Sequence, residues 1–261
     1  MAEPLWIAKT GLDAQKNRLS TISNNLANVN TTGFKRSRTV FEDLIYQNVR
    51  QPGGQTSQET ILPSGLQIGT GVKTVATQKI HQQGSLLQTE NKFDMAIEGR
   101  GFFQILQPNG NLAYTRNGEF QLSADGQIVN SNGYRLQPDI NVPQNALSVT
   151  IGIDGTVSVS QPGNPIPAQI GTIQLADFVN PSGLQALGGN LLGETAASGA
   201  AIIGTPDSLS FGSLVQGSLE GSNVNVVEEL VNMIETQRAY EMNSKAISTA
   251  DQMLQYVNNN L

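Results

Sequence analysis

Residues 102–137 read FFQILQPNGNLAYTRNGEFQLSADGQIVNSNGYRLQ, and this stretch decides the fold. Short runs containing large apolar residues alternate in it with four turn pairs, Asn109-Gly110, Asn117-Gly118, Asp125-Gly126 and Asn132-Gly133. Such a pair between alternating runs is the strongest local signal for a β-hairpin. We therefore predict short strands at 102–106, 112–116, 119–123, 127–130 and 134–137.

The same turn chemistry continues beyond this stretch. Asp154-Gly155 separates Ser148–Gly152 from Thr156–Ser160, which predicts another hairpin. Ile170–Phe178 is typical of a longer strand, and at most a short helix is expected near residues 182–187. Residues from about 72 to 205 are thus predicted to form a β-rich domain.

The N-terminal end has a helical period instead. Residues 4–29 are predicted to form one amphipathic helix, in which Pro4 suits the first turn. Positions spaced alternately by three and four residues form a seam of the kind seen in coiled coils, interrupted only by Gln15. We expect this seam to serve self-assembly through Leu5, Ala8, Leu12, Leu19, Ile22, Leu26 and Val29.

The C-terminal end repeats the pattern less cleanly. Asn225, followed three residues later by Glu228, predicts the start of a second helix. Polar residues interrupt its seam, and Val227, Val231 and Ile234 form a second apolar flank, as expected of a helix with two neighbours. The self-assembly residues predicted here are Val226, Leu230, Met233, Tyr240, Ile247 and Leu254.

These patterns predict an α+β fold in which the N- and C-terminal helices pair as a coiled-coil-like domain and a β-rich middle domain is inserted between them. The predicted helical assembly domain comprises residues 1–33 and 222–261, and the β-rich domain residues 72–205. Extended connecting segments are expected at 34–71 and 206–221, since residues 47–71 are rich in Gln, Gly, Ser, Thr and Pro. Docking of both helices on the β domain is the alternative, because most domains have a single core.

Charge supports association of the two ends. Residues 1–40 hold six Lys/Arg and two Asp/Glu (+4), whereas residues 220–261 hold two and six (−4). Complementary charges of this kind select partner and register more than they supply affinity. The whole chain is only 14% charged and 38% hydrophobic, which suits broad polar surfaces that self-associate.

The chain lacks the residues that several classes of function require. The chain has no cysteine, no long basic run and no apolar stretch of 18 residues, which argues against thiol chemistry, nucleic-acid partners and lipid-spanning segments. The first residues lack the features of a cleavable signal peptide, so we expect export without cleavage or a cytoplasmic protein. His81 is the only histidine and has no partner motif, and Gly69–Thr74 departs from a phosphate-binding loop. We therefore expect no catalytic residue, cofactor or metal site.

Three separated motifs resemble flagellar axial proteins, the family of rod and hook subunits. The first is Ser23–Asn28 with Thr31–Lys35, the second Asp94–Phe103 with Tyr114–Phe120, and the third Gly217–Asn225 with Met233–Glu241. The motif residues expected to matter are Asn24, Asn25, Asn28, Gly33, Phe34, Asp94, Gly99, Gly101, Gln237 and Arg238.

The resemblance implies a structural subunit that assembles helically into a hollow rod in the periplasm and transmits motor torque to the hook. Chain length and segment 47–71 favour the distal rod, with another rod or hook member as the alternative. The implied partners are further copies of the chain, proximal rod proteins, the hook protein, periplasmic and outer-membrane ring proteins, and the flagellar export apparatus.

Two other classes of function remain open. A secreted β-domain enzyme acting on the cell wall would need an acid/base pair, for which Asp94 and Glu98 are the candidates. A carbohydrate-binding or adhesin-like module would place glycan binding in residues 72–205.

Overall fold

A computed structural model describes residues 2–53, 63–208 and 210–259 of the chain. Two α-helices flank the strands, α1 at Ala2–Ala27 and α2 at Val226–Asn259, and a single 3-10 turn, η1, spans Pro181–Gly183. The chain divides into two compact units, which are treated separately below. Unit 1 comprises residues 1–26, 37–78 and 225–261, and unit 2 comprises residues 27–36 and 79–224.

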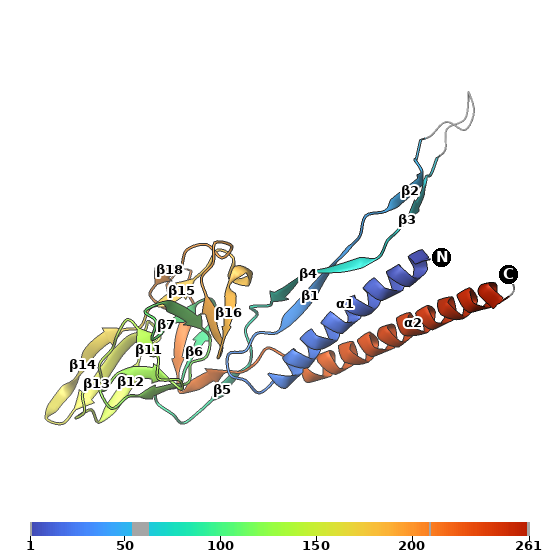
Figure 1. Cartoon of the computed structure of the whole chain (residues 1–261). Coiled ribbons are helices and arrows are strands. Elements are labelled where there is room, and N and C mark those ends of the chain that lie inside the picture. The colour runs from blue at the N-terminus through green and yellow to red at the C-terminus, as the bar shows by residue number, and fades with distance from the viewer. Residues whose placement is uncertain (1, 54–62, 209, 260–261) are drawn as a thin grey trace. The chain divides into compact units, whose positions relative to one another are not determined.

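Unit 1 combines both helices with four strands (Figure 1), which are β1 (Ser37–Asp43), β2 (Gln47–Arg50), β3 (Leu66–Ile68) and β4 (Val72–Lys79). The helices run antiparallel, so both chain ends lie at the same end of the unit. β1 pairs with β4 and β2 with β3, which makes a long two-stranded ribbon beside α1. Part of the predicted extended segment, residues 54–62, lies outside the described residues.

A ladder of short polar side chains holds this ribbon on α1. The Asn17 amide donates to the Thr74 hydroxyl at 3.1 Å, and the Thr39 hydroxyl donates to that of Thr21 at 3.0 Å. Asn25, 2% exposed, closes the ladder: its Nδ2 donates to the Ser37 carbonyl at 2.8 Å, and its Oδ1 accepts from the Ser37 N–H at 2.9 Å. The Asn25 amide thus substitutes for a strand's peptide group, which satisfies a backbone that a helix cannot pair.

Unit 2 is built of the remaining strands around two apolar clusters. They are β5 (Leu86–Gln88), β6 (Met95–Glu98), β7 (Phe102–Leu106), β8 (Leu112–Thr115), β9 (Phe120–Leu122), β10 (Ile128–Asn130), β11 (Arg135–Gln137), β12 (Ser148–Ile151), β13 (Thr156–Gln161), β14 (Asn164–Thr172), β15 (Leu175–Asp177), β16 (Gln185–Gly188), β17 (Leu191–Gly193), β18 (Ile202–Gly204), β19 (Ser213–Gln216) and β20 (Ser218–Glu220). The largest sheet is nine-stranded and centred on β7, which pairs with β8, β11 and β15. Successive side chains of β7 enter opposite clusters, since Phe103 packs in one and Phe102 in the other.

Most of the predicted hairpins are confirmed. Asn109-Gly110 connects β7 to β8, Asp125-Gly126 connects β9 to β10, and Asp154-Gly155 connects β12 to β13, each pair antiparallel. Asn117-Gly118 makes no hairpin, because β8 pairs with β7 and β17 while β9 pairs with β10. Gly118 is needed for another reason: a Cβ there would lie 1.5 Å from the Met95 carbonyl oxygen, where β6 passes.

The predicted fold class is wrong. The described residues are dominated by β-strands, with one helix at each end, and the predicted coiled-coil-like packing of these helices is not confirmed. Leu230 and Tyr240 were expected in that seam but are 43% and 45% exposed. The helices meet instead through small and polar groups, because Gly11 leaves room for the Asn243 side chain and Arg18 donates to Asn232 at 3.3 Å.

The predicted domain boundaries remain a prediction. In the structure, β1 to β4 belong to unit 1 with the helices, whereas residues 27–36 belong to unit 2.

Candidate functional site

The candidate site has two parts, an apolar outer surface on the terminal helices of unit 1 and a buried junction in unit 2. The junction is the set of segments 33–36, 79–84 and 217–223 together with Arg116. It is described first, because all three motifs of the sequence meet in it.

Three charged side chains from the three motifs meet at the centre of the junction. Lys35 Nζ lies 2.5 Å from Glu220 Oε1, and Arg116 Nη1 lies 3.3 Å from Glu220 Oε2. Lys35 is 4% exposed, Arg116 7% and Glu220 0%. A buried carboxylate with two cations satisfies the rule that buried charges are paired.

Backbone carbonyls accept further hydrogen bonds from both cations, although the buried Arg116 Nε has no partner among the described residues. Lys35 Nζ also donates to the Gln82 carbonyl at 2.8 Å, while Arg116 Nη2 donates to the Gly99 carbonyl at 2.5 Å. Burial lowers the pKa of Lys35 and of Arg116 below their ordinary values, and the Glu220 carboxylate opposes that shift in both. The cluster therefore fastens strands to one another and presents no free nucleophile or base.

Glycine permits the close approach of the segments. Gly33 has φ +69°, and a Cβ on it would lie 2.6 Å from the Asn117 amide nitrogen. Its N–H donates to the Glu220 carbonyl at 2.7 Å, so the first and third motifs are joined through backbone as well. A side chain at this position would conflict with both the conformation and the space.

His81 packs against this charged group. Its ring lies edge-on to Phe102 with centroids 5.6 Å apart, and among the described residues both ring nitrogens are buried without a hydrogen-bond partner. Burial lowers the pKa of His81 to about 4, and the positive charges of Lys35, Arg116 and Lys79 add to the effect, while the Pro181 backbone opposes it. His81 is therefore a neutral packing residue near pH 7.

The remaining motif residues have mainly structural environments. Phe34 is buried, and Lys79 Nζ lies 5.3 Å from the centroid of its ring. Gly99 and Gly101 have φ +111° and +132°, and Asn28 accepts from the Thr31 hydroxyl at 3.1 Å. Asn24, Gln237 and Arg238 are exposed on the helices.

The proposed acid/base pair is not arranged for catalysis. Asp94 is buried, and its two carboxylate oxygens accept from the Thr89 hydroxyl at 2.7 Å and the Asn91 amide at 2.8 Å. Glu98, by contrast, is exposed. Asp94 therefore closes the turn before β6. Within residues 2–53, 63–208 and 210–259, no cluster of three His, Asp or Glu side chains could hold a metal ion.

The predicted seam residues differ between the two helices. On α1, Ala8 and Ile22 are buried, whereas Leu5, Leu12, Leu19 and Leu26 are half-buried, as is Val29 just beyond it. On α2, Met233, Ile247 and Leu254 are half-buried, whereas Val226, Leu230 and Tyr240 are exposed. Their role in self-assembly stays a prediction, because the structure contains a single copy.

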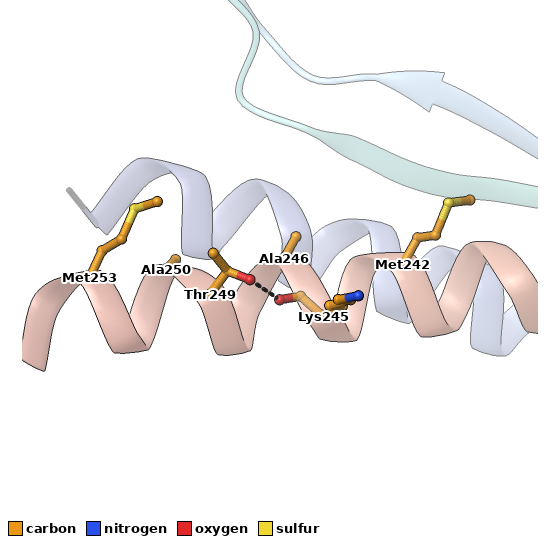
Figure 2. Close-up of a pocket in the computed structure, with 6 residues that line it drawn as sticks. All are labelled: Met242, Lys245, Ala246, Thr249, Ala250 and Met253. Atoms are coloured by element: carbon orange, nitrogen blue, oxygen red, sulfur yellow. Dashed lines mark hydrogen bonds between the residues drawn. The ribbon is translucent and has the colours of Figure 1, made fainter.

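The outer face of α2 carries an apolar patch. Val227, Leu230, Val231 and Ile234 recur at i, i+3, i+4 and i+7, so they share one helix face, and they are 70%, 43%, 50% and 52% exposed. The opposite face is the shielded one, with Glu229 and Thr236 buried. Farther along α2, Met242, Ala246, Ala250 and Met253, with Lys245 and Thr249, line an open groove of about 450 Å³ (Figure 2).

Neither α1 nor α2, the helices of the described part of the chain, is both long and apolar enough to cross a membrane.

The motifs alone did not predict a role for Lys35, Arg116, Glu220 or Asn223, although all four lie in them. A usable signal was present. In a chain that is only 14% charged, each of the three motifs contains a charged residue within two positions of a glycine or an aromatic residue.

Comparison with known proteins gives a consistent result along the whole chain. Residues 5–35 match the family model described as "Flagella basal body rod protein". Residues 96–159 match "Flagellar hook protein FlgE/F/G D1 domain", and residues 215–260 match "Flagellar basal body rod FlgEFG protein C-terminal".

Relatives named "Flagellar basal-body rod protein FlgG" are similar over nearly their full length. The one from Buchnera aphidicola subsp. Schizaphis graminum is 58% identical over 98% of both chains. The one from Caulobacter vibrioides is 49% identical over 97% of both, and that from Bacillus subtilis is 36% identical over 98% of this chain and 97% of its own.

Proposed function

The chain belongs to the flagellar basal-body rod protein family, and we propose that its copies polymerise helically into the distal part of the rod as a hollow drive shaft that carries motor torque to the hook. As a member of this family it is a structural protein of the flagellar basal body, where it assembles into the rod with other flagellar components. The family is not one of enzymes, and we propose that this chain has no catalytic activity of its own.

The observation that carries the proposal is the exposed apolar patch on α2. Val227, Leu230, Val231 and Ile234 present their side chains to water in the single copy. Burying one such side chain fully yields roughly 1.5–3 kcal/mol. A patch of this kind on a helix marks an interaction surface, and in a polymer the neighbouring copies provide the cover.

The open groove farther along α2 supports the same proposal. Met242 and Met253 project from the helix on either side of Ala246 and Ala250 (Figure 2), which leaves a shallow apolar depression between two flexible side chains. On α1, Trp6 is 56% exposed and supplies a large apolar group of the kind that such a depression accepts.

We extend the proposal to specific partners. Proximal rod proteins and the hook protein would adjoin the two ends of the assembled segment, because neighbours in one axial series must offer related helix surfaces. Periplasmic and outer-membrane ring proteins would surround it, and the flagellar export apparatus would deliver the chain.

The test is a charge placed in the apolar patch. We expect Leu230→Asp to block polymerisation of the purified chain, because burial of a carboxylate in an apolar contact is costly. Sedimentation and electron microscopy would measure polymer, and circular dichroism would verify the strands. The matched control is Ser248→Asp, which adds the same charge at another exposed position of α2 and should polymerise. Normal polymers from Leu230→Asp would refute this surface.

A further inference from the structure

Besides the charged side chains of Lys35 and Glu220, each of which also bonds both other segments, the junction contains an uncharged side chain that binds every segment crossing it, Asn223. Its Oδ1 accepts from the Arg36 N–H at 2.7 Å, while its Nδ2 donates to the Ile80 carbonyl at 2.8 Å and to the Gln82 carbonyl at 3.0 Å. One half-buried amide therefore uses its acceptor on one segment and both donors on a second, and itself belongs to the third.

The backbone around Asn223 has few bonds of its own. The Ile80 N–H donates to the Arg36 carbonyl at 2.9 Å, and the Asn223 N–H reaches the Phe34 carbonyl at 3.4 Å. These are single bonds between segments outside the named strands of unit 2. Without the side chain of Asn223, segment 33–36 would be fixed to segment 217–223 by the Lys35–Glu220 pair and by backbone bonds such as that of Gly33 to Glu220. Segment 79–84 would be fixed to it by the Gly84 N–H, which donates to Glu220 Oε1 at 2.9 Å.

We infer that Asn223 is the positioning residue that locks the three segments of the junction in one register, and that this lock sets the torsional stiffness of each subunit in the polymer. The second clause rests on the proposed function. The covalent links between unit 2 and the rest of the chain leave from residues 27, 36, 79 and 224, so load passed along the chain between the units travels through the segments that Asn223 joins.

The geometry makes a specific demand on the side chain. An aspartate at 223 keeps the shape and the acceptor but loses both donors, and it sets a carboxylate oxygen against the carbonyls of Ile80 and Gln82. A buried or half-buried acceptor facing two acceptors is left unsatisfied. Lys35 Nζ shares the Gln82 carbonyl with Asn223 Nδ2, but the Lys35–Glu220 ion pair does not depend on that donor and should persist.

The experiment compares Asn223→Asp with Asn109→Asp in the full chain. Asn109 is a matched control, because its Oδ1 also accepts from a backbone N–H, that of Asn111 at 3.0 Å, while no donation by its Nδ2 is described. Hydrogen exchange of the backbone amides would be followed by mass spectrometry, and the swimming speed of cells carrying each variant would be measured against viscous load.

We expect Asn223→Asp to speed exchange at Arg36 and Ile80 at least tenfold while the amides of β7 keep their protection. Rods should still assemble, but speed should fall more steeply with load than in the control. Unchanged exchange at Arg36 and Ile80, or an equal loss of protection throughout β7, would overturn the lock. If exchange at Arg36 and Ile80 speeds up as expected but swimming speed falls with viscous load no more steeply than in the control, the mechanical role of Asn223 would be overturned. Failure of the unmodified chain to polymerise would instead count against the proposed function.

Discussion

Glu220 is the residue on which the charge balance of the junction depends. It is the shared partner of Lys35 and Arg116, and none of the three side chains is more than 7% exposed. A buried cluster of this kind is costly to break, because removal of the shared carboxylate leaves two buried cations without a counter-charge.

Glu220→Gln should therefore lower the unfolding free energy of unit 2 by about 3–5 kcal/mol. Differential scanning calorimetry of the full chain would measure the loss. The control is Glu42→Gln, which breaks the Lys73–Glu42 pair, whose side chains are 55% and 57% exposed, and should cost less than about 1 kcal/mol. Equal effects of the two substitutions would show that the cluster is not an essential fastening.

His81 makes the stability of the junction sensitive to acid. Since its pKa is about 4 in the folded chain and about 6.5 in the unfolded chain, the unfolded state binds more protons between these values. The contribution of neutral His81 to the free energy of unfolding is thus fully present above pH 6.5, and it is lost as the pH falls towards 4.

The loss amounts to about 3 kcal/mol at pH 4, since each pKa unit corresponds to about 1.4 kcal/mol. We expect His81→Gln to remove this part of the acid sensitivity, leaving only the part due to carboxylates, which both proteins share. Urea unfolding at pH 7, 6, 5 and 4 would reveal the difference. Parallel curves for the two proteins would contradict the assignment of His81.

Among the elements, the turn before segment 34–36 is the one most constrained by space. Gly33 and Gly110 have similar positive φ, +69° and +81°, but a Cβ at Gly33 would strike the Asn117 amide, whereas Gly110 has open space around it.

Gly33→Ala should therefore cost about 1–3 kcal/mol more than Gly110→Ala, which carries only the strain of a left-handed conformation. Thermal unfolding of the two variants gives the difference directly. Equal losses would mean that the first and second motifs do not pack as closely as the structure has them.

The helices and hairpins also show what sequence can predict. The hairpins at Asn109-Gly110, Asp125-Gly126 and Asp154-Gly155 were predictable because the positive φ of the glycine in each pair is a local property of the sequence. The same pattern failed at Asn117-Gly118. Glycine is required there because β6 passes too close for a side chain, and no local sequence pattern reveals that contact.

The start of α2 was predicted from its cap, and the structure confirms it, since Asn225 Oδ1 accepts from the Val227 N–H at 3.0 Å. The face of α2 that contacts α1 was not predicted correctly. Apolar spacing favoured Leu230 and Tyr240, but Gly11 and Asn243 form the contact, so the apolar residues remain outside.

In the molecule as a whole, long separations along the chain limited what could be predicted of the site. Lys35 and Glu220 lie 185 residues apart, and Arg116 and Glu220 lie 104 apart. Resemblance supplied the three motifs, but it did not say that they meet. Family membership, by contrast, needed only the motifs, because each is specific in sequence and their order is fixed.

The division of labour in the chain follows from these observations. The terminal helices keep apolar side chains exposed, and the junction fastens the segments leading to and from the β-rich unit through buried charges and one asparagine. We interpret this as a subunit that gains cover for its helices, and stiffness for its strands, when it is placed among copies of itself.

The most direct test of this account is electron microscopy of the purified, concentrated full-length chain, alone and with Leu230→Asp. The account predicts straight, hollow, helically ordered tubes from the unmodified chain and dispersed single subunits with intact strands from the variant. Unmodified chain that remains dispersed at every concentration, or tubes that form equally well with Leu230→Asp, would contradict it.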